Sequence, residues 1–140
     1  MNYTECTALC GIDCFNCELY VDNITDAMRQ RIAPLIKGDT AQISCAGCRQ
    51  SGCLLLKQEC ATKKCAQERG VTFCSDCTDF PCEKFTPSTD GADRRPHNLK
   101  IYNLLRIKKE GIDSWARDAK NIRERYFRGK MVIGSGPSLD

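Results

Sequence analysis

The chain has 140 residues, of which 41% are hydrophobic and twelve are cysteines, and its formal net charge is +3. This length predicts one domain, no apolar stretch is long enough for a membrane span, and the N-terminus lacks the basic and apolar segments of a signal peptide. We therefore expect a cytoplasmic protein with no membrane partner. In that reducing compartment, so many thiols indicate metal sites rather than the disulfides of a secreted scaffold.

The first cysteine cluster lies in ECTALCGIDCFNCELY, which contains Cys10, Cys14 and Cys17. If this stretch is helical, the three thiols lie on one face and can converge on one ion. Radical S-adenosylmethionine enzymes bind iron with the same spacing, but they usually carry an aromatic residue at the position of Asn16. Twelve cysteines in 140 residues also leave no room for the barrel that holds their cofactor. These two differences argue against that enzyme class.

A helical pattern runs from Glu18 to Lys37, where apolar residues recur at spacings of three and four between charged residues. The apolar positions are Val21, Ile24, Met28, Ile32 and Leu35. We expect this amphipathic helix to contact the core through them. Pro34 should end or kink the helix, and Gly38 with Asp39 should stop it.

The stretch from Cys45 to Cys82 holds eight of the twelve cysteines. It includes two CxxC pairs, Cys45 with Cys48 and Cys74 with Cys77. A CxxC turn places two thiolates on one side of a tight bend, so that two such turns complete a tetrahedral site. Ordinary core residues are sparse here, so we expect metal bonds to supply much of the folding free energy.

Three other parts of this stretch have local signals. Leu54 to Leu56 predicts either a buried strand or the first turn of a helix. Residues 59–69 predict a helix that ends at Gly70. Cys60 and Cys65 are five residues apart, so unless Cys60 lies just before this helix, the two thiols cannot face the same metal, and we expect them to serve different sites. Asp79 to Phe85 predicts a further helix start, with Pro81 in its first turn.

Beyond the cysteines, residues 86–96 have the composition of a linker and residues 97–128 predict a basic helical hairpin. Its first helix should end at Gly111, and Asp113 should cap its second. The apolar positions are Ile101, Leu104 and Leu105 in the first helix and Trp115, Ala119, Ile122 and Tyr126 in the second. We expect the hairpin to pack on the helix predicted from Glu18. Residues 129–140 should be a mobile tail unless Met131 to Ile133 pairs as a short strand.

Together these segments predict a small, mainly α, metal-stabilised domain. In it, an irregular cysteine-rich zinc module at residues 1–85 packs against three amphipathic helices. Charge is uneven along the chain: residues 1–93 hold 9 Lys and Arg against 13 Asp and Glu, whereas residues 94–130 hold 12 against 4. This asymmetry favours a solvated helical face, with an acidic protein or nucleic acid as the alternative partner.

The order of the motifs resembles DUF3795, a bacterial and archaeal cysteine-rich family of unknown function that is expected to bind zinc. The matching phrases are CGxxCxxC, CxGC, KKCAxExG, CxxC and DFPCEK, and LLRIKKEGIDSW is loosely similar. The resemblance implies metal ligands at Cys10, Cys14, Cys17, Cys45, Cys48, Cys60, Cys65, Cys74, Cys77 and Cys82. Cys6 and Cys53 lie outside the pattern, so we expect neither to be needed for metal binding.

Sulfur-only sites select zinc, iron-sulfur clusters or copper(I). We favour two or three zinc ions, because paired CxxC turns suit closed structural sites. An iron-sulfur redox or sensing protein is the alternative, and copper buffering is disfavoured because a buffer needs no amphipathic helices. His97, the sole histidine, lies at the start of a basic helix and is better placed for the surface than for metal. With no histidine near the cysteines to act as a base, we expect a non-catalytic interaction module.

Overall fold

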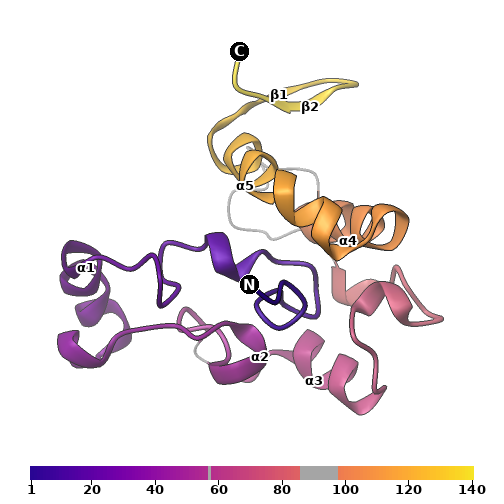
Figure 1. Cartoon of the computed structure of the whole chain (residues 1–140). Helices are drawn as coiled ribbons and strands as arrows, with labels where there is room; N and C mark the ends of the chain where they lie inside the picture. Colours follow the sequence, from indigo (N-terminus) through magenta and orange to yellow (C-terminus); the bar gives the residue numbers. More distant parts are fainter. Residues whose placement is uncertain (57, 86–97) are drawn as a thin grey trace.

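The computed structural model describes residues 1–56, 58–85 and 98–140. Its α-helices are α1 (Asp26–Ile36), α2 (Cys48–Ser51), α3 (Ala61–Glu68), α4 (Leu99–Glu110) and α5 (Ile112–Arg128). In Figure 1, α1 lies at one end, the N-terminal loops lie with α2 and α3 in the middle, and the α4–α5 pair lies above them. The chain is therefore mainly α, as predicted. No helix in the described part of the chain is long and apolar enough to cross a membrane.

The two helices predicted after residue 97 are present. Asn98 caps α4 by accepting two backbone N–H groups of its first turn, and its amide donates to the Phe85 carbonyl. Gly111, whose φ is +83°, joins the two helices. Because α5 already begins at Ile112, Asp113 lies in its first turn and does not cap it.

The C-terminal residues form a β-hairpin that extends beyond α5 (Figure 1). Its strands are β1 (Lys130–Val132) and β2 (Gly136–Ser138), and Met131 pairs with Pro137. Of the two possibilities considered for this segment, the structure therefore has the short strand, although it ends one residue before Ile133.

The larger core lies between the α4–α5 pair and the cysteine-bearing loops. Trp115 and Leu104 are fully buried in it. Its buried members are Leu9, Ala66, Phe73, Cys74, Phe85, Leu99, Leu104, Ile107, Trp115, Ala116, Ala119 and Ile122. Because these come from several separate segments, packing on the two helices ties the loops together.

The expectation that the hairpin packs on the first helix is wrong. α1 belongs to a second, smaller core, whose buried members are Leu19, Ile32, Ala33, Ile43 and Cys45. The predicted helix from Glu18 in fact begins at Asp26, with Thr25 as its cap, and the residues before Thr25 form turns. Pro34 lies within the last turn of the helix. Val21 and Leu35, which were expected to contact the core, are exposed. An apolar stripe identifies a face to be buried, but it does not specify which element covers that face.

Three more segments lack the helix or strand that their sequence allowed. Residues 10–17 are not helical; they form a loop with a short 3-10 turn, η1 (Cys14–Asn16). The Leu54–Leu56 segment is a turn rather than a strand or helix. Where a helix start was predicted at Asp79 to Phe85, the chain has a cis peptide at Phe80–Pro81 and only the 3-10 turn η4 (Glu83–Phe85). The remaining 3-10 turns are η2 (Thr40–Gln42) and η3 (Cys74–Asp76).

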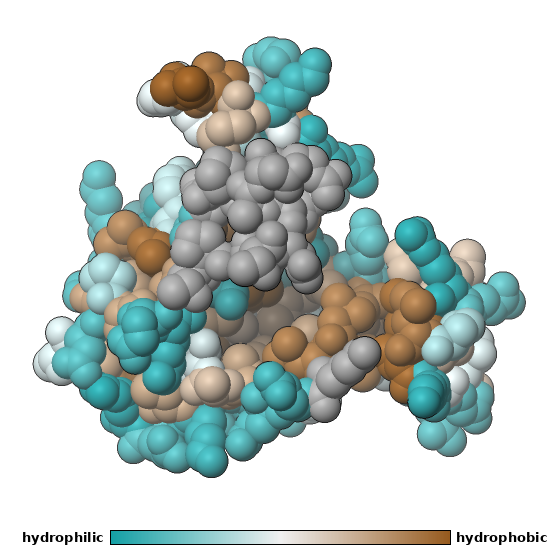
Figure 2. All heavy atoms as spheres, turned by 180° about the vertical axis from the view of Figure 1, so that it is seen from behind, coloured by the Kyte–Doolittle hydropathy of each residue, from teal (hydrophilic) through white to brown (hydrophobic). Residues whose placement is uncertain are grey.

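The smaller core is incompletely covered. Seen from behind, apolar surface gathers on the side where α1 lies (Figure 2). Leu35, Leu55 and Leu56 are 68%, 57% and 50% exposed. Leu35 of α1 therefore presents a large apolar side chain to solvent on this side, and exposed apolar surface is typical of interaction surfaces.

A buried polar pair fixes the N-terminal loop on the two C-terminal helices. Asn103 donates through Nδ2 to the Gly11 carbonyl at 2.8 Å and accepts from Trp115 Nε1–H at 3.2 Å. Gly11 has a φ of +84°, and a Cβ there would lie 2.9 Å from Leu104 Cγ. Only glycine therefore allows the loop to approach α4 this closely.

Replacing Asn103 with Leu should lower the free energy of unfolding by about 2–4 kcal/mol, because the Gly11 carbonyl and the Trp115 indole N–H lose their partner in a buried site. Denaturant unfolding followed by Trp115 fluorescence measures this change. The control, Leu105→Ala at an exposed position of α4, should change the free energy by less than about 0.5 kcal/mol. Equal losses in the two variants would contradict the prediction.

Candidate functional site

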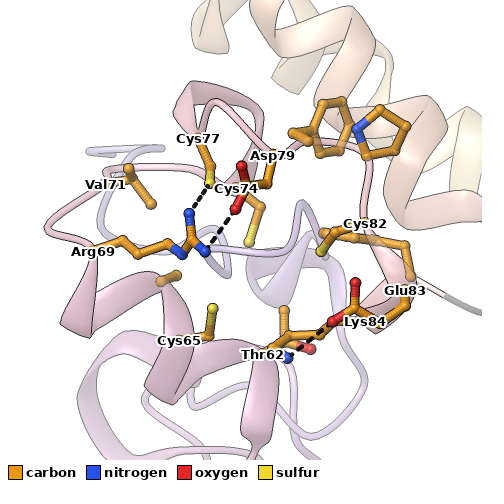
Figure 3. Close-up of a pocket in the computed structure, with 14 residues that line it drawn as sticks. Thr62, Cys65, Arg69, Val71, Cys74, Cys77, Asp79, Cys82, Glu83 and Lys84 are labelled. Carbon is orange, nitrogen blue, oxygen red and sulfur yellow. Dashed lines mark hydrogen bonds and ion pairs between the residues drawn. The ribbon is translucent and has the colours of Figure 1, made fainter.

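Four cysteines line one cavity of about 460 Å³. Cys65 lies in α3, Cys74 begins the turn η3, Cys77 follows that turn, and Cys82 follows the Phe80–Pro81 peptide. Figure 3 shows the Cys65 and Cys82 side chains directed toward the space between α3 and the loop that follows it. We call these four residues the first cysteine set.

Local motifs place this set. The glycine stop predicted at Gly70 is present: its φ is +64°, and the N–H groups of Gly70 and Val71 donate back to carbonyls of α3. The turn η3 is closed by Asp76, whose carboxylate accepts the Phe73 N–H at 2.9 Å. The two motifs turn the chain back so that η3 and Cys65 border the same cavity.

Arg69 borders this cavity and contacts one of its thiols (Figure 3). Its Nη1 donates to Cys77 Sγ at 3.1 Å, and its Nη2 lies 2.7 Å from the Asp79 carboxylate. The hydrogen bond to Asp79 raises the pKa of Arg69, and Cys77 adds to this shift. A permanently charged donor therefore faces the Cys77 sulfur.

A second cysteine set comprises Cys14 and Cys17 from the N-terminal loop with Cys45 and Cys48 from the first CxxC turn. A parallel β-bridge between Tyr20 and Cys45 brings the two loops together. Burial raises the pKa of Cys14 to about 11, and the neighbouring Cys48, Cys45 and Cys17 thiols add to this shift. An interaction with the Cys48 backbone N–H lowers the pKa of Cys14 and partly opposes this shift. Four thiols from two distant segments are thus neighbours.

Cys10, Cys53 and Cys60 lie close to Cys48 of the second set, and Cys10 also neighbours Cys74 of the first set. A cavity of about 330 Å³ is lined by Cys48, Cys53 and Cys60. Cys60 is the residue before α3 whereas Cys65 is inside it, and the two line different cavities. Burial raises the pKa of Cys10, and the nearby Cys60 thiol adds to the shift.

The soft donors in these sets suit zinc or an iron-sulfur cluster. However, no three His, Cys, Asp or Glu side chains within residues 1–56, 58–85 and 98–140 converge closely enough to hold an ion. Burial raises the pKa of Cys74 to about 12, and the neighbouring Cys10, Cys82, Cys65 and Cys77 thiols add to this shift. Crowded thiols of this kind stay neutral near pH 7 unless a cation favours their ionised form. The structure thus groups the donors without a closed coordination geometry.

Cys6 stands apart from both sets. It is buried, and its thiol donates to the Asn2 carbonyl at 3.1 Å. Cys45 of the second set likewise donates through its thiol, to the Gly52 carbonyl at 3.7 Å. None of the twelve cysteines, all of which lie in the described part of the chain, forms a disulfide.

Arg49, directly after the first CxxC pair, joins three cysteine-bearing segments. Its Nε donates to the Thr7 carbonyl at 2.8 Å, and its Nη2 donates to the Thr72 carbonyl at 2.6 Å. The guanidinium lies 5.0 Å from the centre of the Phe73 ring. Arg49 therefore holds the N-terminal loop against the loop that enters the second CxxC pair.

Residues 6–87 match the model of a family described as "Protein of unknown function (DUF3795)". The chain belongs to this family. The resemblance inferred from the motifs is thus confirmed, and the matched region contains all twelve cysteines. No curated protein and no solved structure matches the chain.

In this DUF3795 protein, eight of the ten expected ligands fall into the two cysteine sets, while Cys10 and Cys60 lie near Cys48. Cys53, which the family pattern omits, lines a cavity with Cys48 and Cys60. Sequence reasoning missed Arg49 and Arg69, for which the available signals were adjacency to a CxxC pair and to the glycine stop. His97 and the expected linker at residues 86–96 lie outside the described residues.

Arg49→Met should lower the free energy of unfolding by about 2–4 kcal/mol, because two hydrogen bonds from a charged donor to backbone carbonyls are lost. Thermal and denaturant unfolding measure the change. Arg117→Met, at an exposed position of α5, is the matched control and should change stability by less than about 0.5 kcal/mol. If Arg49→Met unfolds like the control, Arg49 does not join the loops.

Proposed function

We propose that this protein is a zinc-binding interaction module in which the zinc is structural. The first cysteine set would hold one ion and the second set another, while Cys10 and Cys60, with Cys53 beside them, are available to a third. The observation that carries the proposal is the single cavity lined by four cysteines from separate segments. Four thiolates complete the tetrahedral coordination that structural zinc prefers, and a bound ion would cross-link those segments.

The hydrogen bonds at sulfur support this assignment. Cys77 accepts a hydrogen bond from Arg69 at 3.1 Å, and the Cys48 backbone N–H lowers the pKa of Cys14. Donors aimed at sulfur stabilise the negative charge of metal-bound thiolates.

The distribution of apolar contacts supports a structural role for the ions. The smaller core has five buried members, one of which is Cys45 itself, whereas the larger core has twelve. Structural zinc contributes roughly 10–16 kcal/mol of apparent binding free energy in small zinc-finger peptides. Metal bonds would therefore stabilise the α1 side of the molecule where apolar packing is thin.

Metal analysis of protein purified without oxygen should find zinc in a colourless sample. Cys74→Ser should lose about one equivalent of zinc, because it removes a ligand of the first set, and Cys6→Ser should lose none. Elemental analysis and absorption spectra provide the measurement. If the sample contains iron and absorbs at about 400 nm, the zinc proposal is wrong and the iron-sulfur alternative takes its place. Protein without metal in any variant would refute both.

The charge of the C-terminal helices bears on the partner. Arg106 pairs with Glu110 at 2.6 Å and with Asp118 at 2.5 Å, and Arg123 pairs with the buried Asp13 at 3.0 Å. Part of the positive charge is thus neutralised within the fold. Together with the exposed leucines near α1, this favours a protein partner and a solvated basic face over nucleic acid.

Short single- and double-stranded oligonucleotides should show no micromolar binding at low or physiological salt. Exposed cations on α4 and α5 include Lys109, Arg117, Lys120 and Arg128, and a nucleic-acid surface on these helices would draw on them. Fluorescence anisotropy at two salt concentrations makes the measurement. Binding that weakens steeply with salt and is lost when these four residues are changed to Glu would contradict the prediction.

A further inference from the structure

The cavity of the first cysteine set contains a charged group, Arg69, whose effect on the bound ion the zinc proposal does not specify. The guanidinium of Arg69 reaches two partners at once, the Cys77 sulfur at 3.1 Å and the Asp79 carboxylate at 2.7 Å (Figure 3). Arg69 follows α3 as its C-terminal cap residue, and Asp79 lies two residues after Cys77. Asp79 therefore fixes the guanidinium in the orientation in which it donates to sulfur.

The second basic residue of the cavity provides a comparison. Lys84 also lines the cavity, but its Nζ lies 3.5 Å from the Glu83 carboxylate. Lys84 thus contributes charge to the cavity while pairing with its neighbour in the chain. Arg69 contributes both charge and a directed hydrogen bond to a cysteine.

We propose that Arg69 is a positioning residue for the metal ion of the first cysteine set and controls how fast that ion is released. This inference rests on the proposed zinc function. A zinc ion with four thiolates carries a net charge of −2, which makes each sulfur prone to protonation or to attack by a competing electrophile. The Arg69 N–H donor offsets this charge at Cys77 and holds the sulfur in place, so Cys77 dissociates more slowly.

The test uses the full chain purified with its zinc and an excess of a chromophoric chelator. Arg69→Met should accelerate release of one equivalent of zinc by about tenfold or more, the range expected when a partner of a metal ligand is lost. The other equivalents should leave at the wild-type rate. Arg69→Lys, which keeps the charge but lacks the planar fork, should fall between the two. Lys84→Met is the matched control and should release zinc as wild type does.

A spectroscopic measurement separates positioning from a general loss of stability. In cobalt-substituted protein, losing the hydrogen bond to Cys77 should shift the sulfur-to-cobalt charge-transfer band to lower energy in Arg69→Met, but not in Lys84→Met. If both variants accelerate release equally, charge alone acts and the inference is wrong. It is also wrong if every equivalent accelerates together, or if Arg69→Met matches wild type. Wild-type protein that carries no zinc would refute the proposed function instead.

Discussion

Every second residue of the N-terminal loop, from Thr7 to Asp13, forms a hydrogen bond with a different element of the fold. The bonds are Thr7 carbonyl to Arg49 of α2, Leu9 carbonyl to the Cys74 N–H of η3, Gly11 carbonyl to Asn103 of α4, and the Asp13 carboxylate to Arg123 of α5. A loop without a helix or sheet ladder must find partners elsewhere for its backbone polar groups. Here the partners come from nearly the whole length of the chain. Cys10 and Cys14 lie on this loop, so their positions depend on the same four bonds.

Burial makes these bonds important. Asp13 is 1% exposed, and burial raises its pKa while Arg123 and Asn16 oppose the shift. Asn103 is 2% exposed and bonds both the loop and Trp115. Removing one partner of a buried polar group costs more than the bond itself contributes, because the remaining group stays desolvated. The loop is thus held by a few polar contacts, each of which is costly to break.

The helices could be predicted where the sequence determines them locally. Gly111 and the apolar positions at Trp115, Ala119 and Ile122 were sufficient for α4 and α5, and Gly70 for the end of α3. The helix face that α1 buries could not be assigned to a partner, because helical periodicity carries no information about which element covers it. The conformation of the N-terminal loop, for which a helix was only one possibility, could not be predicted for a related reason. Its conformation is set by Arg49, Asn103 and Arg123, which lie far away in sequence.

The cysteine spacing predicted thiol-rich sites but not their membership. Which CxxC pair joins which other cysteines depends on how the loops fold: Cys74 and Cys77 lie with Cys65 and Cys82, and Cys45 and Cys48 with the N-terminal loop. From its spacing, Cys53 was not expected to bind metal, because it belongs to no CxxC pair. In the structure, however, Cys53 and Cys48 line the same cavity. Arg69 has no motif of its own. Its role follows only from where the glycine stop and Asp79 place it.

The two cores give the molecule two differently stabilised ends. Around α4 and α5, a fully buried Trp115 and Leu104 anchor a core of twelve buried residues, which can persist on apolar packing. Around α1, the core is smaller and Leu35, Leu55 and Leu56 remain exposed. The second cysteine set joins this weaker end to the N-terminal loop, while the first set lies beside the stronger core. An ion in the second set would therefore contribute more to the stability of the fold. An ion in the first set would lie beside a solvent-accessible cavity, with Arg69 bonded to one of its sulfur ligands, and would leave while the surrounding core stays folded.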